Sequence, residues 1–113
     1  MNAVKDKLIA LVGEELAAAN AIYQPFHSTH EGYAVLREEV EEAAEEMDYV
    51  KSGLECIWYY VRTDEMESIA EAVDSIERHA IRLAAEAIQV AAMARKFQAI
   101  GKGMNVPGKE EEK

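Results

Sequence analysis

Apolar side chains recur at every seventh position over the last third of the chain, and this spacing constrains the fold more than any other feature. The row comprises Ile69, Ile76, Leu83, Val90 and Phe97. A second row of small or apolar residues follows four positions after each of the first four, at Val73, Ala80, Ala87 and Ala94. Such a repeat is typical of a long helix that packs along its length against another helix. The alanines predict a close approach of the two.

Start and stop signals bound this helix. Thr63 and Asp64, with Glu67 three residues after Asp64, match a helix start. The helical pattern continues to about Ile100, after which glycines and a proline follow. We therefore expect a helix over about 64–100, and a flexible charged tail over residues 101–113.

A helix is also predicted near the start of the chain. Apolar residues recur at helical spacing over residues 3–22. This helix ends before Pro25, because a proline disfavours the helical conformation of the residue before it.

Another helix begins near Thr29, where Ser28 and Glu31 match a capping box. It runs to about Ser52. Gly53 breaks or weakens it, so the aromatic segment 54–62 either continues this helix or forms a separate short one.

These elements predict an all-α fold: an antiparallel hairpin of two long helices with the first helix as a third member. Residues 1–100 form one domain, since 113 residues match the usual domain size. Aromatic residues make up only 7% of the chain, so its core is mostly aliphatic. The long alanine-rich surface exceeds what three helices cover, and we expect a homodimer or homotetramer to complete it.

The formal net charge of −10 opposes nucleic-acid binding. No apolar run has the length of a membrane span, and no signal-like segment opens the sequence. Together with a single cysteine, Cys56, these features predict a cytoplasmic protein without a membrane partner.

Several of the many carboxylates are expected beside the core. At about 100° per residue, Leu36, Val40, Met47 and Leu54 mark the buried face of the second helix. Glu39 and Glu42 then share one flank of that face, with Glu46 one turn further on. Glu38, Glu41 and Glu45 face solvent.

The same projection on the third helix places Glu86 and Gln89 on one flank of its apolar face. If the two flanks meet in the hairpin, three carboxylates and one amide converge. Such a set of oxygen ligands suits Mg²⁺ or Mn²⁺. A solvated acidic helix face is the competing interpretation, because glutamate is a good helix former.

The segment from His30 to Glu42 resembles the Glu-Glu-x-x-Glu motif of the MazG-like nucleotide pyrophosphohydrolases, and its flanking His-Glu-Gly-Tyr is similar to short phage-type members. The segment from Glu86 to Ala94 resembles the Glu-x-x-Asp half of that motif. The likeness covers roughly residues 27–97. It implies the all-α NTP pyrophosphatase fold and a magnesium-dependent hydrolase that cleaves a nucleoside triphosphate into a monophosphate and pyrophosphate.

Carried over by position, the resemblance implies that Glu39, Glu42, Glu86 and Gln89 are metal ligands. Gln89 stands where the family has aspartate, so metal affinity is expected to be lower, and Glu46 is a candidate to compensate.

The resemblance also assigns further roles. Glu38 would orient the attacking water, and His30 lies where the family contacts its nucleotide. Arg82, Arg95 and Lys96 are candidates for binding the phosphates. Arg82 also stands four residues before Glu86, so an ion pair within the helix is its alternative role.

Two other functions compete with this one. Gln89 favours a catalytically inert MazG-like scaffold or interaction protein. A di-iron carboxylate bundle would need Glu-x-x-His motifs, and no glutamate here has a histidine three residues on.

Overall fold

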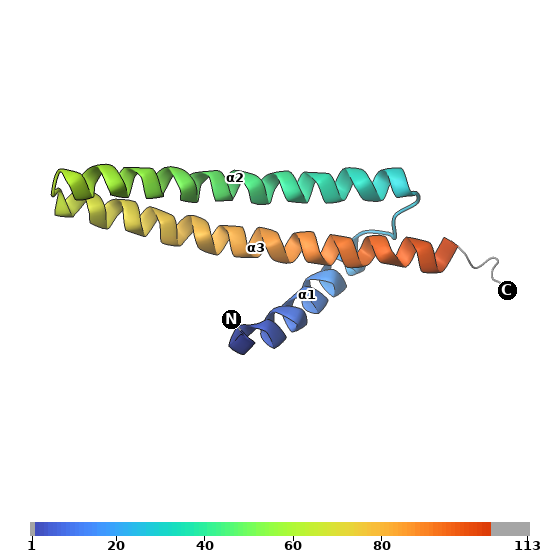
Figure 1. The fold of residues 1–113 in the computed structure, drawn as a ribbon. Helices are drawn as coiled ribbons and strands as arrows, with labels where there is room; N and C mark the ends of the chain where they lie inside the picture. Colours follow the sequence, from blue (N-terminus) through green and yellow to red (C-terminus); the bar gives the residue numbers. More distant parts are fainter. Residues whose placement is uncertain (1, 105–113) are drawn as a thin grey trace. The chain divides into compact units, whose positions relative to one another are not determined.

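The computed structural model describes residues 2–104, and within this range the chain contains three α-helices and no strand (Figure 1). They are α1 (Asn2–Ile22), α2 (Thr29–Arg62) and α3 (Met66–Met104). The helices α2 and α3 are antiparallel and joined by a short turn. The predicted all-α class is thus confirmed. Residues 105–113 of the expected tail lie outside the described residues.

Of the two forms expected for the second helix the structure shows the longer one, and the third helix exceeds its expected end. α2 continues through Gly53 to Arg62, so the segment 54–62 belongs to it. A Cβ on Gly53 would lie 2.7 Å from Cγ1 of Ile76 in α3, which shows that this glycine allows a close helix approach rather than a break. α3 passes its expected end at Ile100 and reaches Met104.

Hydrogen bonds at the start of α2 agree with the expected capping box. The backbone N–H of Glu31 donates to Oγ of Ser28 at 3.1 Å. The Glu31 carboxylate accepts from the backbone N–H of His27 at 2.5 Å, one residue before Ser28. One N–H that α2 leaves unpaired, that of Glu31, and the N–H of His27 before the helix are therefore both satisfied.

The turn between α2 and α3 differs from the expected start signal at Asp64. Asp64 has a φ of 57°, a left-handed conformation that often ends a helix. The backbone N–H of Glu65 donates to the carbonyl of Tyr60, five residues back. Asp64 therefore closes α2, and α3 begins two residues later at Met66.

The chain divides into two compact units that share the two long helices. The core unit contains the described parts of Met1–Glu39 and Ile88–Lys113, and the hairpin unit is Val40–Ala87. The single domain expected over residues 1–100 stays a prediction.

A small apolar core lies in the core unit. Val12 of α1 packs with Ala92 and Met93 of α3, and these three side chains are buried. Partly buried apolar residues surround them: Leu16, Ala19, Phe26, Val35, Leu36 and Ile88. This cluster fixes α1 against the C-terminal part of α3.

The hairpin unit has a different packing pattern. None of residues 40–87, all of which the structure describes, is buried. Half-buried residues instead alternate at spacings of three and four along each helix: Ala43, Glu46, Val50, Gly53, Ile57 and Tyr60 on α2; Ile69, Ala72, Ile76, His79, Leu83 and Glu86 on α3. This coiled-coil-like seam joins the two helices.

The residues of α3 that form the seam differ from the predicted ones in one of the two rows. The first row, from Ile69 to Phe97, is half-buried as expected. The second row of the observed seam lies three residues after the first and includes His79 and Glu86. The predicted second row lay four residues after the first, and its members Val73, Ala80 and Ala87 are exposed. Both spacings lie beside the first row on a helix, so apolarity alone selected the wrong one.

The expected buried face of α2 is also corrected. Leu36 packs in the core cluster, but Val40, Met47 and Leu54 are exposed, at 48%, 40% and 63%. With Val61, these residues form an exposed stripe at every seventh position of α2, here called the α2 stripe. Among the described residues, no helix is both long enough and apolar enough to cross a membrane.

At two glycines of the core unit, we expect substitution by alanine to change the stability of the fold in opposite directions. A Cβ on Gly32 would lie 2.6 Å from Cδ2 of Phe97, whereas one on Gly13 has its nearest neighbour at 3.6 Å. We expect Gly32→Ala to lower the free energy of unfolding by about 1–3 kcal/mol through overpacking. Gly13→Ala raises it by up to about 1 kcal/mol through helix propensity.

Chemical denaturation followed by circular dichroism measures both changes. Equal stabilisation by the two substitutions would contradict the close contact between Gly32 and Phe97.

Candidate metal centre

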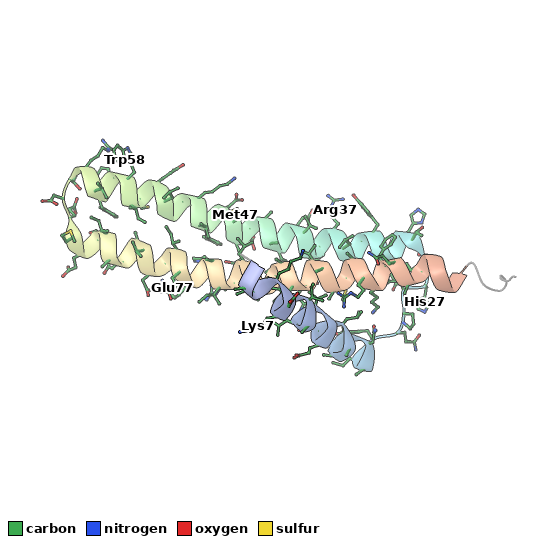
Figure 2. The ribbon with its side chains drawn as sticks, turned by 60° about the horizontal axis from the view of Figure 1, so that its bottom comes forward. Lys7, His27, Arg37, Met47, Trp58 and Glu77 are labelled. Carbon is green, nitrogen blue, oxygen red and sulfur yellow. The ribbon has the colours of Figure 1, made fainter. Side chains whose placement is uncertain are left out.

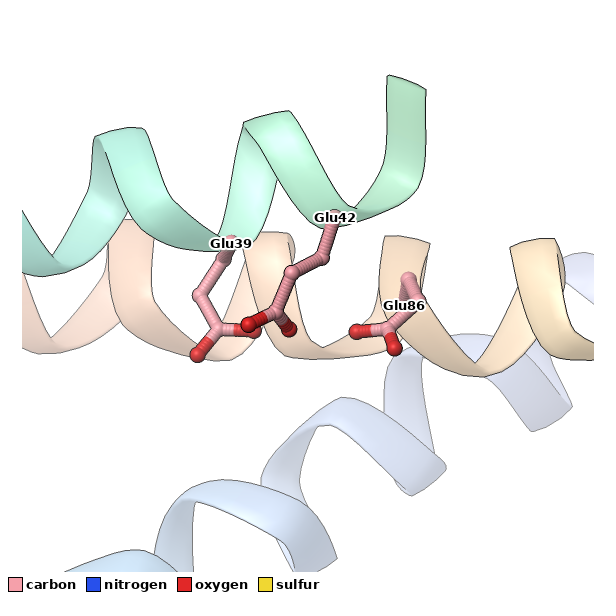
Figure 3. Close-up of side chains that lie close together, drawn as sticks. All are labelled: Glu39, Glu42 and Glu86. Atoms are coloured by element: carbon pink, nitrogen blue, oxygen red, sulfur yellow. The ribbon is translucent and has the colours of Figure 1, made fainter. Parts of the chain in front are cut away.

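Three of the sequence-predicted ligands lie together in the structure. Glu42 of α2 and Glu86 of α3 face each other in the hairpin, and Glu39 lies one turn before Glu42 on α2 (Figure 3). Each offers one carboxylate oxygen, and these oxygens all lie within 4.8 Å of one another. We call these residues the carboxylate cluster.

The helical seam explains why these side chains meet. Glu39 and Glu86 are half-buried and continue the three-and-four spacing of their helices, so each points toward the opposite helix. Glu42 is exposed and follows Glu39 by three residues, which places it on the neighbouring row. The cluster therefore extends from the seam to the surface.

The surroundings of Glu86 disfavour the charged form of its carboxylate. The pKa of Glu86 is raised, first because burial removes water from its carboxylate, and then because of the negative charge of Glu42. A hydrogen bond with Glu42 and the charge of Glu46 act in the same direction. Repelling carboxylates of this kind are stabilised either by a shared proton or by a cation.

Gln89, the fourth predicted ligand, has a partner that the sequence did not indicate. Its side-chain amide donates to the Glu15 carboxylate of α1 at 2.5 Å. Gln89 follows Glu86 by three residues on α3, and its partner Glu15 belongs to a different helix, α1. Sequence projection missed Glu15 because the register of α1 against α3 is set by tertiary packing.

Glu46, the residue expected to compensate for Gln89, pairs with His79. The Nδ1 atom of His79 lies 2.7 Å from Oε1 of Glu46, and both side chains are largely buried, at 14% and 17% exposure. The Tyr49 ring stacks on the imidazole at a centroid distance of 4.5 Å. The half-buried charge of Glu46 thus has a local partner.

The other predicted site residues lie at the surface, with one exception. Glu38 and His30 on α2 are exposed, as are Arg82 and Arg95 on α3. Among the described side chains Arg82 forms no ion pair, so the pairing with Glu86 is not observed.

Lys96 is the exception, because it is buried at 7% exposure. It lines a cavity together with Arg95. The roles assigned to all these residues stay predictions.

Comparison of the chain with protein-family models, with curated proteins and with solved structures gave no match.

The raised pKa of Glu86 predicts a pH dependence of stability in the absence of divalent ions. The folded state binds this proton more tightly than the unfolded state, so the contribution is present at low pH and is lost as pH rises through the raised pKa. We expect Glu86→Gln to be more stable than the parent protein at neutral pH, with the difference shrinking as the pH falls toward the ordinary glutamate pKa of about 4.3.

Melting temperatures measured in a chelator across this range test the expectation. Glu45→Gln is the matched control, since Glu45 is exposed on α2 and its removal leaves the repulsion at Glu86 in place. A less stable Glu86→Gln at neutral pH would mean that a cationic partner already compensates the Glu86 carboxylate.

Proposed function

We propose that the chain is a divalent-metal-dependent nucleoside triphosphate pyrophosphohydrolase of the MazG-like type. The observation that carries the proposal is the convergence of Glu39, Glu42 and Glu86 from two helices. These residues occur along the chain as Glu-Glu-x-x-Glu followed by a glutamate on the next helix, which is the order in the motif that the sequence resembles.

The donor set fits Mg²⁺ or Mn²⁺. Hard divalent cations take carboxylate oxygens at 2.0–2.1 Å in octahedral geometry, so two ligand oxygens on one ion lie at most about 4.2 Å apart. The oxygens of the cluster lie within 4.8 Å of one another, so small side-chain rotations bring them to the separation that one ion requires. The cluster has three carboxylates, and the pKa of Glu86 is raised first by burial and then by the charge of Glu42, so a cation has a favourable position to occupy.

The residues of this chain have distinct roles in the proposed reaction. Glu39, Glu42 and Glu86 hold the ion, and Glu38, exposed one residue before Glu39, orients the attacking water. A bound Mg²⁺ supplies charge neutralisation of the phosphates and a lower pKa for that water. The products are a nucleoside monophosphate and pyrophosphate.

Gln89 supports the alternative of a catalytically inert MazG-like scaffold. Its amide brings no negative charge, and its nitrogen is committed to Glu15. Glu15 is not one of the converging carboxylates, so the convergence of Glu39, Glu42 and Glu86 is what favours the enzyme over the scaffold.

Hydrolysis of a nucleoside triphosphate panel with Mg²⁺ or Mn²⁺, followed by release of pyrophosphate, tests the proposal directly. We expect Glu42→Gln to lower kcat by about 100-fold or more, because a lost metal ligand removes several kcal/mol of transition-state stabilisation. Glu45→Gln removes the same charge from an exposed position of α2 and keeps the parental rate.

Metal binding separates the two candidate functions. A rise in melting temperature with Mn²⁺, present in Glu45→Gln and absent in Glu42→Gln, without hydrolysis of any triphosphate, identifies the inert scaffold. If Mn²⁺ has the same effect on both variants, the cluster is a solvated acidic surface and the enzyme proposal fails.

We further propose that a second copy of the chain covers the α2 stripe. An isolated pair of helices is a poor folding unit, since each helix must bury an apolar stripe against another layer. The hairpin unit buries no side chain by itself, yet Val40, Met47, Leu54 and Val61 are exposed at coiled-coil spacing. Two hairpins related by a two-fold axis would form a four-helix bundle.

Aromatic side chains at the tip of the hairpin extend this surface. Trp58 is 62% exposed and projects from the end of α2 (Figure 2). The guanidinium of Arg62 lies 5.4 Å from the centre of its ring. Exposed tryptophan and arginine side chains are the residues that most often anchor protein interfaces.

Sedimentation at micromolar concentration tests the assembly. We expect a dimer or tetramer for the parent protein, and dissociation by Leu54→Glu, which places a charge in the stripe. Ser52→Glu adds the same charge at an exposed position outside the stripe and leaves the assembly intact. A parent protein that sediments as a monomer contradicts the proposal.

A further inference from the structure

The core unit contains a cavity of about 570 Å³ between the C-terminal part of α1, the segment that follows it, and the end of α3. This volume is in the range of small-molecule sites. Its lining includes Arg95 and Lys96 of α3, the aromatic rings of Tyr23 and Phe26, and the side-chain amides of Asn20 and Gln98.

Lys96 is the unusual member of this lining. Its side chain is buried at 7% exposure, and its ammonium lies 4.7 Å from the centre of the Phe26 ring. The ring provides a cation–π contact but accepts no conventional hydrogen bond. Among the side chains that the structure describes, no carboxylate pairs with this ammonium. A buried ammonium without acceptors is costly, so an anion in the cavity would stabilise it.

The charge of the cavity is opposite to that of the chain. The sequence has 22 acidic and 12 basic residues, yet the described residues that line the cavity include two cations and no aspartate or glutamate. Arg95 is exposed whereas Lys96 is buried, so the two cations differ in how far they are open to solvent. This arrangement favours an anionic ligand over a metal ion.

We propose that this cavity binds a phosphate ester with a planar ring, of the size of a nucleoside monophosphate. Lys96 and Arg95 bind the phosphate oxygens through charge-assisted hydrogen bonds. The exposed Tyr23 ring stacks on the planar ring, and the amides of Asn20 and Gln98 pair with its polar edge. The ligand is a product of the proposed reaction and the two cations are those that the resemblance implied for its phosphates, so the choice of ligand rests on the proposed function. Binding here needs no divalent ion.

Calorimetric titration with the four common nucleoside monophosphates in a chelator tests this site. We expect at least one of them to bind, with inorganic phosphate weaker and the parent nucleoside weaker still. Arg95→Gln weakens binding about tenfold or more, the usual effect of losing a hydrogen bond to a charged group. Ala99→Trp, which fills the cavity from an exposed lining position without changing charge, also abolishes or weakens it.

The control is Lys51→Gln, which removes one positive charge from an exposed position of the hairpin unit and leaves affinity unchanged. Circular dichroism confirms that each variant is folded, and Arg95→Gln alone suffices if Ala99→Trp is not. Absence of monophosphate binding at millimolar concentration overturns the proposal, as does equal affinity in Arg95→Gln and Lys51→Gln. Because every titration is done without metal, a failure here is distinct from a failure to hydrolyse triphosphates.

Discussion

The packing of α2 against α3 along a seam with alternating spacings of three and four residues is the interaction on which the rest of the structure depends. It brings Gly53 against Ile76 and sets the facing positions of every other pair in the hairpin. In a seam of this kind each side chain is held by neighbours on the opposite helix. A carboxylate at a seam position is therefore placed as firmly as an apolar residue, although it gains less from burial.

The seam carries two glutamates and a histidine in the hairpin unit, and the protein accommodates them in different ways. Glu46 is paired with His79, under the stacked ring of Tyr49. Glu86 has only carboxylates among the side chains that shift its pKa. Replacing buried charged groups with well-packed apolar residues is often neutral or stabilising. Their presence at half-buried positions is a stability cost that points to a use other than packing.

Much of the fold follows from sequence because it depends on local chemistry. Helix type, the Ser28 cap and the end of α1 before Pro25 rest on residues close together in the chain. The row from Ile69 to Phe97 also faces the partner helix as expected. The second row of the seam was misplaced because His79 and Glu86 occupy it, and a search for apolar residues rejects both.

In the candidate site, too, some features follow from single helices and others depend on how the helices pack. Angular projection along single helices brought Glu39, Glu42 and Glu86 to a common flank, and the structure brings their oxygens together. The contact between Gln89 and Glu15, and the pairing of Glu46 with His79, depend on which residues of different helices stand opposite each other. That register is decided by side-chain volumes along a whole interface, as at Gly32 against Phe97, and no local pattern encodes it.

The distribution of compensated and uncompensated charge connects these observations. Each half-buried ionisable group needs a counter-charge, a proton or water, because burial penalises its charged form. Glu46 has a histidine, whereas Glu86 has further carboxylates, and Lys96 has an aromatic ring without a carboxylate partner among the described side chains. Glu86 and Lys96 carry charges of opposite sign, so the ligands proposed for them differ: a cation at Glu86 and an anion at Lys96. A metal-bound phosphate compound contains both kinds of charge, so the two proposed ligands are compatible with each other in one acidic helical protein.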